Sequence, residues 1–142
     1  MKKFMMLPSK AGIPIEKIKV TDAQRNEVQV LLSLSDYSVF YKIVLLQTSF
    51  FPTKHGEIMA MGIPVITNSG VGDVADIVKK YNSGIVLEKL TGDDYLKTTQ
   101  FLSKEDPFER SAIREGAKDY FAIENAVKGY RNIYDLILKK ID

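Results

Sequence analysis

The sequence contains no cysteine. Disulfide bonds and metal sites built on thiolates are therefore excluded, and the absence fits a reducing compartment such as the cytoplasm. The sequence also has no large excess of charge of either sign, with 20 Lys and Arg against 18 Asp and Glu. No run of like charges is longer than two residues. Binding of nucleic acid normally needs a concentrated basic surface, so we expect no nucleic acid as a partner.

Long apolar segments are also missing. The opening MKKFMMLP has two lysines followed by apolar residues, but the apolar run stops at Pro8 and is too short for a signal-peptide core. No stretch approaches the roughly 20 apolar residues of a membrane-spanning helix. With 142 residues, 45% of them hydrophobic, the chain is expected to be a single cytoplasmic domain.

What is present is an alternation of strand-like and helix-like segments. A β-rich stretch over 15–20 precedes a helix through 26–34, and Thr21 and Asp22 are suited to cap that helix. The near-continuous apolar run over 37–46 is typical of a strand buried on both faces of a parallel sheet.

The alternation continues to Glu88, with helices at 53–61 and 75–81 and strands at 62–67 and 84–88. Such a pattern predicts right-handed crossovers. The expected fold class is therefore α/β, a Rossmann-like parallel sheet with helices on both faces.

Only helices are predicted after Glu88: one near 92–103, one opened by Asp106 and Pro107, and one over about 122–140. The last has a single apolar face, which we expect to lie in the core. Three apolar residues fall outside that face and are expected to be exposed or used in self-contact: Leu136, Leu138 and Ile141. The face itself consists of Ile123, Ala126, Val127, Tyr130, Ile133, Tyr134 and Ile137.

The segment PTKHGEIMAMGIPVI, residues 52–66, carries the strongest functional signal. Its helix follows the carboxyl end of the long apolar strand, where ligands of α/β proteins collect, and helix amino termini bind phosphate readily. Glu57 lies in the first turns, where it either stabilises the helix dipole or faces a ligand, and Lys54 could neutralise a diphosphate. The only histidine, His55, is expected to be an exposed residue, and we assign it no role.

A glycine-rich loop permits a second interpretation. Gly70, Gly72 and Ala75 form G-x-G-x-x-A between a strand and a helix, and Glu88 follows where a dinucleotide fold places its ribose-binding acid. A dinucleotide half-site needs a further strand after Glu88, and none is predicted. The loop is then either a tight turn or one wall of a binding pocket.

The motif S-x-x-P-T-K-x-G-E-x-M-A-M-G-I-P-V-I, followed by Asn68 and Gly70-Val71-Gly72-Asp73, resembles the donor-binding region of the group 1 family of retaining glycosyltransferases with the B-type fold. The resemblance extends over roughly residues 15–90 and includes EVQVLLSLSDYSVF and NSGIVL. It implies transfer of a sugar from a nucleotide sugar with retention of configuration, often in lipopolysaccharide or capsule polysaccharide biosynthesis, with no cofactor and no metal ion.

The resemblance also implies the site. Two glutamates separated by seven residues flank the family's donor loop, and Glu57 matches the second, which binds the ribose hydroxyls. Ser49 stands where the first would be, so one acidic group of the pattern is missing. The loop amides that meet phosphate and sugar fall on residues 51–54, and Pro52 has no amide to donate. The donor-binding residues implied in this way are Ser49, Phe51, Pro52, Thr53, Lys54, Glu57, Gly70 and Gly72, with Thr21 near the nucleobase.

The resemblance covers only the later part of the C-terminal, donor-binding domain. The N-terminal acceptor domain is then a missing partner, so the chain alone is expected to be inactive. Strand 15–20 would pair directly with strand 37–46, or the exposed sheet edge would form a homo-oligomer. The full enzyme would be able to associate peripherally with a membrane. The alternative function is a non-catalytic nucleotide-binding or interaction module from a truncated or split gene.

Overall fold

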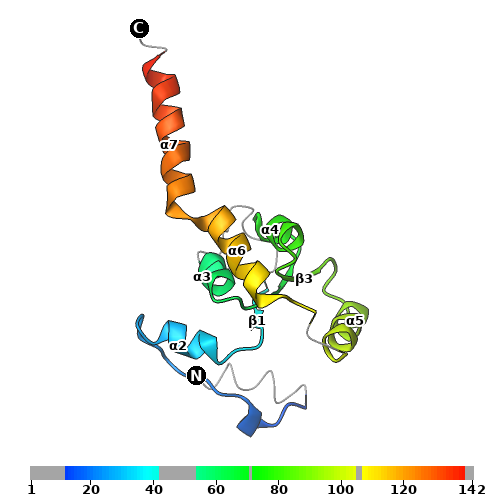
Figure 1. Cartoon of the computed structure of the whole chain (residues 1–142). Coiled ribbons are helices and arrows are strands. Elements are labelled where there is room, and N and C mark those ends of the chain that lie inside the picture. The colour runs from blue at the N-terminus through cyan, green and yellow to red at the C-terminus, as the bar shows by residue number, and fades with distance from the viewer. Residues whose placement is uncertain (1–11, 42–53, 71, 105–106, 140–142) are drawn as a thin grey trace. The chain divides into compact units, whose positions relative to one another are not determined.

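A computed structural model describes residues 12–41, 54–70, 72–104 and 107–139 (Figure 1). The chain divides into two compact units, Met1–Leu31 and Leu32–Asp142. The first has one short 3₁₀ helix, η1 (Ile15–Lys17), among its described residues, and helix α2 (Val28–Ser33) continues from it into the second unit. Neither element has a buried residue.

Two predictions for the first unit are wrong. Residues 15–20 form no strand, because none of the strands in the described chain pairs with them and a lone strand leaves its backbone groups without partners. Thr21 and Asp22 do not cap α2, which begins only at Val28. Instead, the hydroxyl of Thr21 donates to the carbonyl of Asp22 at 3.1 Å.

The second unit is a mixed α/β structure around a three-stranded parallel sheet of order β1-β2-β3. The strands are β1 (Ser38–Val39), β2 (Val65–Asn68) and β3 (Gly84–Leu87). Ser38 pairs with Val65, and Val65 pairs with Gly84. The parallel sheet predicted from the alternation is confirmed. Half of the strand predicted over 37–46, residues 42–46, lies outside the described residues.

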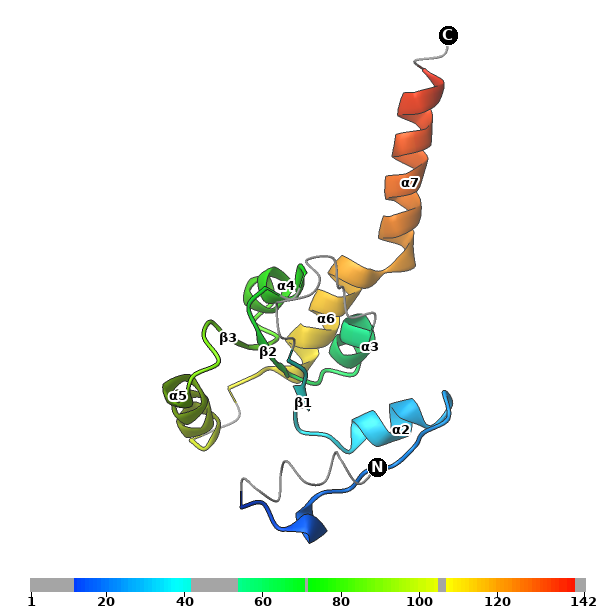
Figure 2. The same cartoon turned by 180° about the vertical axis from the view of Figure 1, so that it is seen from behind.

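Helices α3 (Lys54–Ala60) and α4 (Val74–Lys80) are the crossovers between consecutive strands (Figure 2). Both end with a left-handed residue, Gly62 at φ 73° and Asn82 at φ 46°. After α3, the N–H of Ile63 donates to the carbonyl of Ile58 at 3.2 Å, and Gly62 donates to Met59 at 2.8 Å. This is a Schellman motif, which turns the chain directly into β2.

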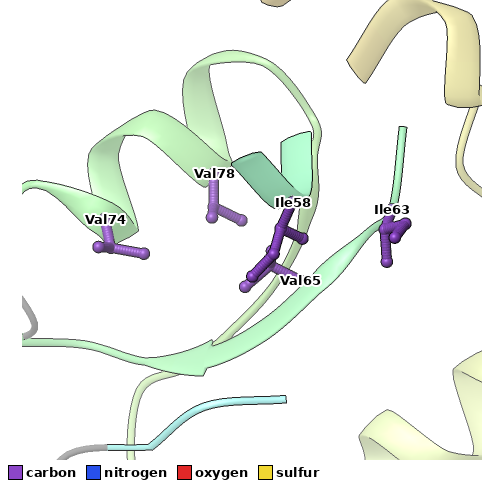
Figure 3. Packing of buried hydrophobic residues seen from close by; sticks show 5 residues of the cluster. All are labelled: Ile58, Ile63, Val65, Val74 and Val78. Atoms are coloured by element: carbon purple, nitrogen blue, oxygen red, sulfur yellow. The ribbon is translucent and has the colours of Figure 1, made fainter. Parts of the chain in front are cut away.

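Two clusters of buried side chains form the core of the second unit. In the first, Val74 and Val78 project from α4 toward Val65 on β2, with Ile58 and Ile63 beside them (Figure 3). The second joins α3, α4 and helix α6 (Arg110–Phe121), which runs between them in both views. The members of the second cluster are Met59, Ile77, Phe108, Ile113 and Ala117.

The predicted helices after β3 are present as α5 (Gly92–Leu102), α6 and α7 (Ile123–Leu138). Helix α6 starts later than predicted, with Glu109 as its N-cap in place of a start at Asp106 and Pro107. The reason is Phe108, which is only 8% exposed. Glu109 is still extended, so the helix begins only after this ring has entered the second cluster.

The prediction that the apolar face of α7 lies in the core is wrong. No residue of α7 is buried. Leu136 and Leu138 are exposed, as expected, and Ile141 lies outside the described residues. The periodicity correctly predicts an amphipathic helix, but the part of the chain that the structure describes offers no apolar surface that covers it.

Replacing Gly84 by alanine should be strongly destabilising. Gly84 has φ 155°, and a Cβ there would lie 1.9 Å from the carbonyl oxygen of Val65, so β3 would have to move away from β2. We expect Gly84→Ala to lower the free energy of unfolding by about 2 to 4 kcal/mol.

The matched control is Gly129→Ala in α7, where a Cβ would meet nothing within 4 Å. This change should raise helix stability by about 0.5 to 1 kcal/mol. Urea unfolding of the three proteins gives the comparison. A Gly84→Ala protein as stable as the parent would show that the close approach of β2 and β3 is not a constraint.

Candidate functional site: the groove between α3 and α6

Helices α3 and α6 pack against each other in opposite directions. A methyl group on Gly56, near the start of α3, would lie 3.0 Å from the ring of Phe121, the last residue of α6. At the other end, a methyl group on Gly62 would meet the carbonyl of Arg110 at 2.7 Å. The amino-terminal turns of α3 therefore lie beside the carboxyl-terminal half of α6.

A groove of about 610 Å³ opens between these two helix segments. Its apolar lining comes from small side chains and one aromatic ring, and its polar lining is charged. The apolar residues are Gly56, Ala60, Ala117, Phe121 and Ala122, and the charged residues are Glu57, Arg114, Glu115 and Lys118.

The charged residues of the groove are not equally engaged. Lys118 Nζ contacts the Glu115 carboxylate at 2.8 Å, and both side chains are largely exposed to solvent. Arg114 Nη2 donates to the carbonyl of Met61 at 3.3 Å, at the carboxyl end of α3, where a cation is favourable. The carboxylate of Glu57 has no hydrogen bond or ion pair to any residue in the described ranges, so it is available to a ligand.

The predicted site residues that the structure describes are only partly brought together. Glu57 is exposed in the first turn of α3, and Lys54, the first residue of the helix, is also exposed. Gly70 and Gly72 are exposed in the loop between β2 and α4, with φ of 79° and 47°. Because this loop and the start of α3 both follow carboxyl ends of parallel strands, they lie at the same edge of the sheet.

The remaining predicted site residues are not part of this arrangement. Thr21 belongs to the first compact unit, whereas Glu57 belongs to the second. Four members of the donor loop lie outside the residues that the structure describes: Ser49, Phe51, Pro52 and Thr53.

Helix α6 contributes residues to the groove that were not predicted from the sequence. Arg114, Lys118 and Phe121 stand at i, i+4 and i+7, which places them on one helical face. That spacing was a usable signal, but it could not show which other helix the face lies against.

His55 is the clearest correction in this region. We expected an exposed residue, but its side chain is completely buried. The ring lies between two aromatic rings, with centroids 6.0 Å from Phe40 and 5.7 Å from Phe121. Neither ring nitrogen has a hydrogen-bond partner in the described part of the chain. Burial lowers the pKa of His55 to about 4, so at neutral pH the imidazole is an uncharged core group.

The dinucleotide interpretation gains no support. The carboxylate of Glu88, which would have to bind a ribose, accepts a hydrogen bond from Lys79 Nζ at 2.7 Å. Only helices follow β3 within the described residues. The further strand that a dinucleotide half-site requires is therefore absent from that part of the chain.

A second groove, of about 370 Å³, lies between β3 and α5 and has Lys97 and Phe101 among its lining residues. It contains no carboxylate among its described lining residues. In the described ranges, no group of three or more potential metal-ligating side chains occurs. None of the helices there is long and apolar enough to cross a membrane.

Comparisons of the chain with protein-family models, with curated proteins and with solved structures found no match.

The buried imidazole should make stability depend on pH. In the unfolded chain, histidine binds a proton below about pH 6.5, whereas folded His55 does so only near pH 4. Because folding lowers the pKa of this basic group, neutral His55 contributes its full share to the free energy of unfolding above pH 6.5. That contribution is lost as the pH is lowered toward 4. At pH 4.5 the loss from this residue should be about 2 kcal/mol.

Urea unfolding at pH 7 and pH 4.5 tests this expectation, with His55→Leu as the comparison. Both proteins lose stability as their carboxylates protonate, but the parent should lose about 2 kcal/mol more than the variant. Equal losses would mean that His55 is accessible to protons in the folded state.

Proposed function

We propose that the second unit binds the nucleoside diphosphate part of a nucleotide sugar, as the donor-binding portion of a retaining glycosyltransferase. The observation that carries the proposal is Glu57. It is exposed in the first turn of α3, it lines the groove between α3 and α6, and its carboxylate has no partner among the described residues.

The chemistry of a carboxylate suits the ribose of a nucleotide. Its two oxygens only accept hydrogen bonds when ionised, so they can take the two vicinal hydroxyls of one ribose together. A role in a structural ion pair would show a partner for this charge. Glu57 has none within the described residues, and it therefore retains its full capacity to accept.

Cations near Glu57 could meet the diphosphate. Lys54 precedes Glu57 by one helical turn, so their side chains leave the same face of α3. Across the groove, Lys118 is engaged with exposed Glu115 and with no other side chain in the described ranges. An exposed ion pair of this kind is worth at most about 1 kcal/mol. Lys118 can therefore exchange that carboxylate for a phosphate at little cost.

The apolar part of the groove provides a surface for a ring. Phe121 is half-buried and lines the groove beside Ala117 and Ala122. A nucleobase or sugar could pack against this ring while its polar atoms remain in contact with solvent. The groove thus offers an acceptor for hydroxyls, a cation for phosphate and an apolar face.

The second candidate is a non-catalytic interaction module. One observation favours it, namely that α7 exposes its apolar side chains along its whole length. This candidate is compatible with nucleotide binding, because α7 contributes no described residue to the groove.

Replacing Glu57 by alanine should weaken binding of nucleoside diphosphates. Loss of hydrogen bonds to a charged acceptor costs about 1.5 to 3 kcal/mol, which corresponds to roughly a ten- to hundredfold increase in Kd. Stability should fall by no more than about 1 kcal/mol, since alanine is a good helix former and only a helix-end charge is lost. Isothermal titration calorimetry with nucleoside diphosphates of different bases measures the effect.

The matched control is Asp93→Ala, which removes another exposed carboxylate from the first turn of a helix, α5. This variant should bind the nucleotides as the parent does. If the parent binds and Glu57→Ala binds equally well, Glu57 serves only its own helix and the proposed site is wrong. If the parent binds no nucleoside diphosphate, the proposed function is wrong.

A further inference from the structure

Helix α7 is drawn orange to red in Figure 1, and its large apolar side chains are exposed to solvent. None of its residues is buried. Its large apolar side chains are between 49% (Val127) and 72% (Ile123) exposed. A continuous apolar surface of this kind on a soluble domain marks an interaction site.

The apolar residues of α7 follow the spacing of a coiled-coil seam. They are alternately four and three residues apart, which gives the 3.5-residue period of two supercoiled helices. Ala126 and Ile133 flank this seam on one side, and Glu124 and Arg131 flank it on the other. The seam consists of Ile123, Val127, Tyr130, Tyr134 and Ile137.

We propose that α7 pairs with α7 of a second copy of this chain, in an antiparallel two-helix coiled coil. When Val127 of one copy faces Tyr130 of the second copy, Ile123 faces Tyr134 of the second copy. Glu124 then lies beside Arg131 of the second copy, and the reverse pair forms by symmetry. The arrangement is isologous and closes on itself, so it stops at a dimer.

The charges favour the antiparallel orientation. In a parallel pair, Arg131 would face Ala126 of the second copy and no ion pair would flank the seam. In the antiparallel pair, two Glu–Arg contacts flank it. Opposite charges at these positions select the orientation and register of coiled coils.

A second copy fits the surface better than a membrane does. Amphipathic helices that lie on membranes have a strongly basic polar face. The polar face of α7 instead mixes signs, with Glu124 and Asp135 balancing Lys128 and Arg131.

The size of the surface also fits a small dimer. Five large side chains, those of Ile123, Val127, Tyr130, Ile133 and Tyr134, would each bury on the order of 100 Å² against the second helix, or roughly 1,000 Å² over both copies. That area is near the lower limit for a specific interface. The dimer should therefore dissociate at micromolar concentrations, and dilution should reveal the monomer.

Sedimentation equilibrium of the whole chain from about 1 µM to about 1 mM tests the proposal. The mass should rise from 16.0 kDa toward twice that value. Tyr130→Glu, which places a charge in the middle of the seam, should weaken association at least tenfold. Leu136→Glu is the matched control, because Leu136 is 64% exposed against 66% for Tyr130 but lies outside the seam.

A charge reversal tests the orientation. Glu124→Arg should weaken the dimer, and Arg131→Glu in the same chain should restore it. Circular dichroism of each variant checks that the helix persists. The proposal is overturned by a monomer at every concentration, even one that binds anionic vesicles. It is also overturned by a dimer that survives Tyr130→Glu, because such a dimer would use another surface, for example the sheet edge.

Discussion

Strand β2 is buried at each of its four residues, and the rest of the second unit depends on satisfying its backbone. Buried N–H and C=O groups need partners, so β1 and β3 must pair on its two sides. Parallel pairing in turn requires that α3 and α4 carry the chain back to the starting edge. The left-handed residues Gly62 and Asn82 end these helices, and Gly84 lets β3 approach β2 closely.

The same constraint creates the candidate site. Because both crossovers start at the carboxyl ends of strands, the first turn of α3 and the glycine loop before α4 lie at one edge of the sheet. Helix α6 covers α3 in the opposite direction, anchored through Ile113 and Ala117 in the second core cluster. Its carboxyl-terminal half therefore lies beside Glu57, and Lys118 and Phe121 become part of the groove.

The sequence predicts those parts whose causes are local. Apolar runs and helical periodicity correctly predicted β2, β3, α3 and α4. It did not predict that residues 15–20 form no strand, that His55 is buried, or that α7 is uncovered. These outcomes depend on distant partners: pairing neighbours for 15–20, the rings of Phe40 and Phe121 for His55, and an apolar surface for α7. The partnership of α6 with Glu57 was missed for the same reason.

The most direct test of the account is a map of amide chemical shifts as nucleoside diphosphates are titrated into the isotopically labelled chain. We expect the largest shifts in the first turn of α3, in α6 near Lys118 and Phe121, and around Gly70 and Gly72. Shifts confined to the groove between β3 and α5, near Lys97 and Phe101, would place the nucleotide elsewhere. That result would contradict the account. The absence of any shift at about millimolar nucleotide would also contradict it, because at that concentration only binding weaker than about −4 kcal/mol escapes detection.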